Sequence, residues 1–173
     1  MTPSESPPLL RSQAQSKRPI TCPRSGALLA LDNLNRYDKT LDAVLDHMAP
    51  AMQGLSRRDR ALFNHLVFGV LRWRLRLDTV IGTYANRPLS QMAPTILNVL
   101  RIGLFQILFM DRIPASAAVN TSVELARQRK STHVAGFVNA LLRNVLRNPQ
   151  RVSIPDRNES PVAHMATTKS FPH

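Results

Sequence analysis

An apolar stripe at helical spacing runs through residues 57–84 and limits what this segment can fold into. Its members recur every three or four residues: Leu62, Leu66, Val70, Trp73, Leu77 and Val80. Because an α-helix turns once in about 3.6 residues, this spacing gathers the side chains on one face. An adjoining face, about 40° wide on the same wheel, carries Arg58, His65, Arg72 and Arg76. The segment is therefore predicted to be one long helix with a core side and a cationic side.

The charge of the chain is strongly positive and unevenly distributed. The 173 residues contain 23 Lys and Arg against 11 Asp and Glu, a net charge of +12 at pH 7. A charge of this size favours a polyanionic partner over a small metabolite, and RNA is the natural partner of a basic helical surface. Residues 27–56 carry four aspartates, whereas residues 57–78 carry six arginines and two acids. The basic character therefore belongs to particular helices.

The same periodicity predicts helices at residues 24–36, 41–52, 94–110, 114–129 and 133–147. Pro50 is expected to perturb the end of the second of these, and Ser56 is the candidate N-cap of the long helix. Pro94 suits the first turn of the helix that it opens. No segment keeps the clean alternation of a strand bounded by turn residues. The predicted fold class is all-α.

Both ends of the chain are expected to be disordered. Residues 1–23 are rich in Pro and Ser, and residues 149–173 are polar with recurrent prolines. No apolar run is long enough to cross a bilayer and no signal peptide is evident, so the cytoplasm fits best. The single cysteine, Cys22, excludes an internal disulfide and a cysteine-rich zinc site. It is interpreted as an incidental thiol, because no second cysteine or positioned partner supports catalysis.

Several uncharged residues inside the predicted helices are interpreted as packing devices. Asn120, Asn139 and Gln106 are expected to be buried amides that fix how helices meet. Gly69 and Gly103 are expected to let helices approach closely, because glycine inside a helix costs about 1 kcal/mol relative to alanine. The five histidines show no metal-ligand spacing, so no metal is expected.

Three ordered blocks carry a family resemblance: DRALFNHLVFGVLRWRLRLD at 59–78, ILNVLRIGLFQILFMDRIPASAAVNTSVELAR at 96–127 and GFVNALLRNVLR at 136–147. In their order and spacing, residues 24–148 resemble the NusB-like helical domain. This domain occurs as the transcription antitermination factor NusB and as the N-terminal module of ribosomal RNA cytosine-C5 methyltransferases of the Sun/Fmu type. The residues of the segments VLRWRLRLD and RIPASAAVN resemble the methyltransferase branch more than the free factor.

The resemblance implies a fold of about six to seven helices in two packed small bundles, and RNA binding by basic residues. It implies no catalysis within these residues, since the family's S-adenosylmethionine loop and paired cysteines belong to a domain C-terminal to this module. Only 25 residues follow Asn148, and they contain neither a Gly-rich loop nor a cysteine. No cofactor and no enzyme activity are therefore expected.

The cationic face of Arg58, Arg72 and Arg76 is the first candidate for contact with RNA phosphates. The alternative is a solvated face, or pairing with the preceding acids Asp38, Asp42 and Asp46. Arg60 and Arg74 lie at the other edge of the apolar face and are expected to hold a neighbouring helix instead.

Two smaller basic groups are further candidates. Lys17, Arg18 and Arg24 are similar to the basic N-terminal segment of the antitermination factor, which contacts single-stranded RNA; an uninvolved tail is the alternative. Arg143 and Arg147 lie four residues apart on the last helix, where cations near a helix C-terminus are an equally good explanation. One Trp, two Tyr and six Phe are too few for an interleaved aromatic platform, so phosphate contacts should dominate.

Two functions remain open. The first is an RNA-binding module of a ribosomal RNA methyltransferase, detached from its C-terminal catalytic domain. The second is a free-standing NusB-type antitermination factor that acts with a protein partner. A helical module that binds only protein fits the charge of +12 less well. No membrane partner is expected.

Overall fold

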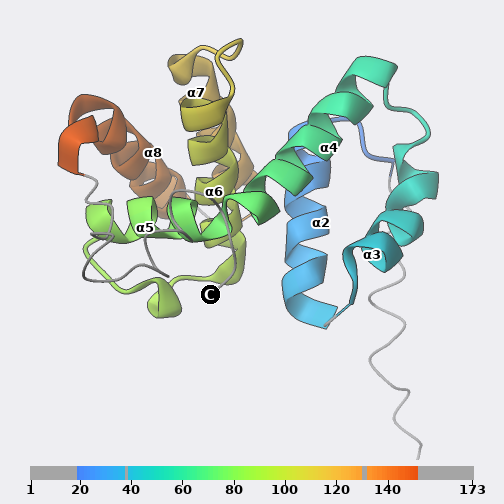
Figure 1. Cartoon of the computed structure of the whole chain (residues 1–173), viewed down its shortest axis with the longest axis horizontal. Helices are drawn as coiled ribbons and strands as arrows, with labels where there is room; N and C mark the ends of the chain where they lie inside the picture. Colours follow the sequence, from blue (N-terminus) through green and yellow to red (C-terminus); the bar gives the residue numbers. More distant parts are fainter. Residues whose placement is uncertain (1–18, 38, 130–131, 152–173) are drawn as a thin grey trace, which may run out of the picture. The chain divides into compact units, whose positions relative to one another are not determined.

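The computed structural model describes residues 19–37, 39–129 and 132–151 (Figure 1). Within these residues the chain forms seven α-helices and no strand, which confirms the predicted all-α class. The helices are α2 (Pro23–Tyr37), α3 (Leu41–Met48), α4 (Arg57–Arg72), α5 (Arg74–Tyr84), α6 (Pro94–Phe109), α7 (Ala115–Arg129) and α8 (Thr132–Arg147). Two 3-10 turns lie between helices, η1 (Ala49–Met52) and η2 (Leu89–Gln91), and a third, η3 (Pro149–Arg151), follows α8.

The prediction of one helix over residues 57–84 is wrong, because the structure has two helices that meet at Trp73. Trp73 has φ −101° and ψ 16°, outside the helical region. No proline or glycine stands at this position, so the local sequence gives no sign of the break. The apolar stripe continues through it, which is why periodicity alone joined the two helices.

The chain divides into two compact units, residues 1–63 and 64–173, and each is described by itself. In the N-terminal unit α2 packs against α3, with buried Leu28, Leu31, Val44 and Met48 among its core residues. The backbone N–H of Ile20 donates to the carbonyl of Ala51 at 2.9 Å and so ties the residues before α2 to η1. This bond links the segment before α2 to the turn that follows α3.

Local capping sets the helix boundaries in this unit. The Ser56 hydroxyl accepts from the Asp59 N–H at 3.1 Å and donates to the Asp59 carboxylate at 2.7 Å, which confirms Ser56 as the N-cap of α4. Thr40 caps α3 by accepting from Ala43 N–H at 3.4 Å. The predicted effect of Pro50 is confirmed as well, because α3 gives way to the 3-10 turn η1 there.

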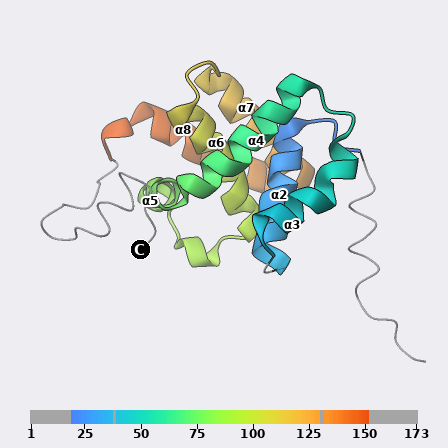
Figure 2. The same ribbon diagram turned by 45° about the vertical axis from the view of Figure 1, so that its right-hand side comes forward.

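Helix α6 is the centre of the C-terminal unit. Every residue from Ile96 to Gln106 is buried, and α6 packs against α5, α7 and α8 (Figures 1 and 2). Pro94 occupies its first turn, as predicted. A Cβ on Gly103 would lie 2.6 Å from Oγ of Ser122 on α7 and 2.9 Å from Leu142 on α8. The predicted close approach at Gly103 is therefore confirmed.

The last described residues close back onto the C-terminal unit. The Tyr84 hydroxyl at the end of α5 donates to the carbonyl of Asn148. The guanidinium of Arg151 in η3 lies over the Tyr84 ring, 5.4 Å from its centroid. These contacts of Tyr84 join the end of α5 to the residues that follow α8.

The expected role of the amides holds only in part. Gln106 is fully buried and its side-chain amide donates to the Ile102 carbonyl of the same helix at 3.1 Å. The expectation for Asn120 is wrong, because its side chain is exposed on α7. Asn139 is half-buried and accepts from Arg143 on its own helix at 2.8 Å, so this bond does not fix how two helices meet.

Candidate nucleic-acid interface

The break between α4 and α5 places aromatic and cationic side chains together in the C-terminal unit. The N–H of Trp73 donates to the Gly69 carbonyl at 3.0 Å, and its carbonyl accepts from Leu77 at 2.9 Å, so both helices keep a hydrogen bond to this residue. A Cβ on Gly69 would lie 2.0 Å from Cζ of Phe105. The room at Gly69 is filled by the Phe105 ring of α6, so it serves a side chain and not the close approach of two helix backbones that was predicted.

Four rings follow one another along this contact. The Trp73 ring stacks on Phe109 with centroids 4.7 Å apart and planes 21° apart. Phe105 stacks on Phe109 at 5.4 Å, and His65 meets Phe105 edge-on at 5.4 Å. The guanidinium of Arg76 lies over the stacked rings of Trp73 and Phe109, 5.8 Å from the Trp73 centroid and 5.6 Å from that of Phe109. Such cation–π contact holds an arginine in place without consuming its hydrogen-bond donors.

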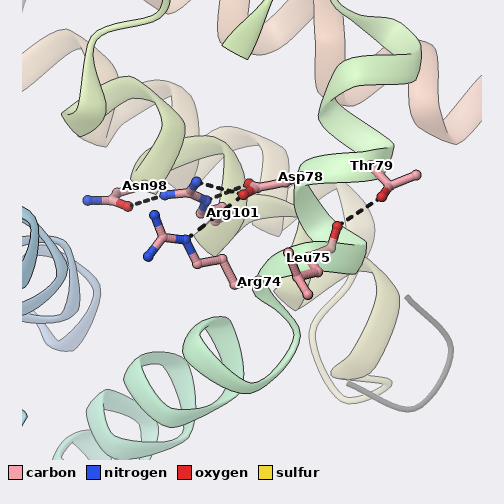
Figure 3. Close-up of polar contacts among 6 residues, drawn as sticks. All are labelled: Arg74, Leu75, Asp78, Thr79, Asn98 and Arg101. Carbon is pink, nitrogen blue, oxygen red and sulfur yellow. Dashed lines mark hydrogen bonds and ion pairs between the residues drawn. The ribbon is translucent and has the colours of Figure 1, made fainter. Parts of the chain in front are cut away.

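A partly buried ion pair between Arg101 and Asp78 anchors α5 to α6 beside the break, and Figure 3 shows its members. Arg101 is only 4% exposed. Its Nε and Nη2 donate to the two oxygens of Asp78 at 2.7 and 2.9 Å, and Nη1 donates to Asn98 Oδ1 at 3.0 Å. Nε of Arg74 lies 3.9 Å from the same carboxylate. The bidentate bonds of Arg101 fix the register of α5 against α6. Arg74 is a second arginine near the same carboxylate.

The structure separates the predicted cationic face into two parts. Arg58 is exposed in the first turn of α4, in the N-terminal unit. Arg72 is exposed at the end of α4 and Arg76 is half-exposed on α5, both in the C-terminal unit. Because the break lies between Arg72 and Arg76, the wheel that placed all three on one continuous helix does not apply to Arg76.

The alternative of pairing with acids finds no support among the described residues. None of the residues in 19–37, 39–129 and 132–151 forms a hydrogen bond or ion pair with the side chains of Arg58, Arg72 or Arg76. Asp42 and Asp46 are exposed on α3. Asp38, the third acid of that alternative, lies outside the described residues.

Arg60 and Arg74 were expected to hold a neighbouring helix, but neither makes its polar contact with one. Arg60 donates to the Leu55 carbonyl at 3.4 Å, in the loop just before its own helix. Arg74 lies against Asp78 one turn along α5. The arginine that does join two helices is Arg101, which the sequence analysis did not single out.

The smaller basic groups have different outcomes. Arg143 and Arg147 are exposed on α8, with Arg147 at its last residue and Arg143 bonded to Asn139. Arg24 is half-buried in the first turn of α2 and has an interaction partner. Lys17 and Arg18 lie outside the described residues.

Sequence reasoning did not single out the aromatic group of Trp73, Phe105 and Phe109, in which Phe105 is buried and the other two rings are half-exposed. It also missed Phe68, which is 51% exposed on α4 one turn before Arg72. The glycine at position 69 was the available signal, since a predicted close contact at Gly69 implies a large partner side chain opposite. Nothing in the sequence identifies that partner as Phe105.

Other kinds of site find no residues in the part of the chain that is described. No group of three or more His, Cys, Asp or Glu side chains is placed to hold a metal ion there. Cys22 is an exposed free thiol. None of the described helices is both long and apolar enough to span a bilayer.

The helices and their order define the class of this protein: it is an all-α domain with the NusB-like fold. The chain matches Thermotoga maritima NusB with a TM-score of 0.66 and 19% identity, over 75% of this chain and 93% of that one. It also matches a protein chain in the crystal structure of a plectonemic RNA supercoil, with a TM-score of 0.68 and 16% identity over 76% of this chain and 96% of the other. Identities this low show the fold alone.

The family follows from the sequence. The NusB family model matches residues 22–147, and the chain belongs to the NusB family. It is 34% identical over 166 residues to a putative methyltransferase of Mycobacterium tuberculosis, and this match covers 94% of this chain and 36% of that protein. It is 32% identical over 154 residues to a probable ribosomal RNA small subunit methyltransferase B of Bacillus subtilis, covering 88% and 33%. The Escherichia coli ribosomal RNA small subunit methyltransferase B is 33% identical over 129 residues, covering 75% and 29%. The chain thus spans about a third of the length of these relatives.

Proposed function

We propose that this chain is an RNA-binding module whose role is to bring a ribosomal RNA methyltransferase activity to its RNA, without catalysing methyl transfer itself. The observation that carries the proposal is the set of arginines around the α4–α5 break. Arg72 and Arg76 have no polar partner among the described residues, in a chain with a net charge of +12. Unpaired guanidinium groups on rigid helices are suited to bind phosphate oxygens.

The methyltransferase branch is favoured by the relatives. At 32–34% identity they are named as methyltransferases, two of them of small subunit ribosomal RNA. The catalytic chemistry would then belong to polypeptide outside the 173 residues, and ribosomal RNA would be the partner. A cytoplasmic location accompanies this role.

A free-standing antitermination factor is the second candidate, and one observation favours it. The match to Thermotoga maritima NusB covers 93% of that chain, so the fold here has nearly the full extent of that protein. In this role the chain would bind RNA together with a protein partner. Binding to fragments of small-subunit ribosomal RNA at least tenfold tighter than to unrelated RNA of equal length would favour the methyltransferase branch over this one.

The test of RNA contact is the salt dependence of binding, measured by fluorescence anisotropy of labelled single-stranded RNA. Replacing Arg58, Arg72 and Arg76 together by Gln should weaken binding to all sequences. Each lost phosphate contact should lower the slope of log affinity against log salt by about 0.7, so the triple variant should lose about two units. Helicity and melting temperature should stay unchanged, since all three side chains are exposed or half-exposed.

The matched control replaces Arg60 and Arg74 by Gln, which removes the same kind of charge from side chains with polar contacts of their own. This double variant should retain nearly the parent slope. An unchanged salt slope in the triple variant would exclude Arg58, Arg72 and Arg76 as phosphate contacts. The remaining candidates would then be Lys17, Arg18, Arg24, Arg143 and Arg147. If the parent chain itself shows no salt-dependent RNA binding, the proposed function is wrong.

A further inference from the structure

The arginine at the α4–α5 break lies over two stacked rings, whereas Arg87 and Arg151 each lie over one ring, that of Phe137 and that of Tyr84. The guanidinium of Arg76 is held over the rings of Trp73 and Phe109 at 5.8 and 5.6 Å from their centroids. These two rings are stacked on each other, and Phe109 is stacked in turn on buried Phe105. The support beneath Arg76 is therefore anchored in the core of the C-terminal unit. An arginine so fixed loses less side-chain entropy when it binds a ligand.

The donors of this guanidinium find no acceptor in the part of the chain that the structure describes. No hydrogen bond or ion pair to Arg76 is formed among the residues described, whereas the neighbouring Arg74 lies 3.9 Å from Asp78. The nearby carboxylate of Asp78 already binds both Nε and Nη2 of Arg101. Asp78 is thus engaged by Arg101 and Arg74.

The surroundings of Arg76 combine planar groups with positive charge. Trp73, Arg76 and Phe109 are each half-exposed, so the group reaches the surface. Phe68 and Arg72 lie four residues apart on α4 and therefore on the same side of that helix, and both are exposed. Flat side chains alternating with cations are the composition by which proteins hold single-stranded nucleic acid, where bases stack and phosphates pair.

We propose that Arg76, supported by Trp73 and Phe109, is a stacking site for an unpaired nucleobase of single-stranded RNA, with Arg72 beside it on a phosphate. This inference rests on the proposed function, since it names how the RNA is held. It changes one expectation of the sequence analysis, namely that phosphate contacts alone dominate. Double-stranded RNA would not satisfy the site, because its bases are already stacked on each other.

The first test separates planarity from charge. Arg76→Lys keeps the positive charge and removes the flat guanidinium, while Arg74→Lys makes the same change at a neighbouring arginine that lies against Asp78 and has no place in the proposed site. With single-stranded RNA, Arg76→Lys should bind about tenfold more weakly than the parent, at an unchanged salt slope. Arg74→Lys should stay within about twofold of the parent. Equal affinities of the parent and Arg76→Lys would overturn the stacking proposal and leave the proposed function in place.

The second test uses intrinsic fluorescence, because Trp73 is the single tryptophan of the chain. A base stacked over Arg76 should change Trp73 emission at the concentrations at which labelled single-stranded RNA binds. Inorganic polyphosphate, which carries the charges without bases, should bind and leave the emission nearly unchanged. RNA binding without an emission change, or the same change with polyphosphate, would contradict stacking. Absence of RNA binding by the parent chain would overturn both this inference and the proposed function.

Discussion

At the scale of single residues, Arg101 is the clearest case of a side chain whose role is set by its surroundings. It lies within the most apolar helix, and an isolated charge there would be costly to bury. Asp78 and Asn98 accept from all three of its nitrogens at 2.7 to 3.0 Å, so burial is compensated. The consequence is that one arginine of this basic chain is structural, whereas Arg72 keeps its charge at the surface.

Replacing Arg101 by Met should destabilise the fold by about 3 kcal/mol, because Asp78 would keep a charge with only Arg74 near it. Combining Arg101→Met with Asp78→Asn should recover part of the loss, since no unpaired charge remains. The free energy of unfolding from urea titration measures both effects.

The exposed pair of Arg127 and Glu124, with N and O 3.0 Å apart, supplies the control. Arg127→Met should change stability by less than about 1 kcal/mol, as is usual for pairs in water. A similar small cost for Arg101→Met would contradict a structural role for the pair of Arg101 and Asp78.

At the scale of the elements, the contact between α4 and α6 decides the geometry of the candidate interface. Gly69 lets the ring of Phe105 lie directly on the α4 backbone, and Trp73 stacks on Phe109 one turn further along both helices. The aromatic group follows this crossing and ends under Arg76. Changes at the crossing should therefore disturb the interface as well as the core.

Replacing Gly69 by Ala should destabilise the protein by about 2–3 kcal/mol, because the new Cβ would lie 2.0 Å from the Phe105 ring. The same replacement at Gly136 on α8 meets no atom within 4 Å. There it should stabilise by about 0.5–1 kcal/mol, since alanine restricts the unfolded chain and favours helix. Thermal melting followed by circular dichroism measures both; a stable Gly69→Ala variant would show that the two helices do not meet as described.

At the scale of the whole molecule, the family of this chain is shown directly, whereas the activity of its longer relatives involves more than the matching segment. The NusB family membership rests on a match to residues 22–147, and the fold agrees with it. The relatives named as methyltransferases are about three times as long as the segment that matches here. Any methyltransferase activity of the whole would therefore depend on regions that this chain does not match.

The 173-residue protein should bind single-stranded RNA and fail to bind S-adenosylmethionine. The physical reason is that phosphate contact needs only exposed arginines, whereas the family's donor site needs a Gly-rich loop after a strand, and the described residues form helices alone. Isothermal titration calorimetry with S-adenosylmethionine, beside RNA titrations of the same preparation, measures both. Stoichiometric binding of the donor would contradict the non-catalytic role.

The sequence by itself determined the local features of this protein. The helices could be located from the hydrophobic periodicity, the Ser56 cap and Pro94, because each of these depends on residues a few positions apart. Gly69 and Gly103 located two of the contacts between elements. The tertiary structure alone decided the break at Trp73, the pairing of Arg101 with Asp78, and which arginines remain without a polar partner. These features depend on groups far apart in the chain, such as Asp78 and Arg101, which are 23 positions apart. A helical wheel contains no information about such partners, so only the packed structure could separate the structural arginine from the surface ones.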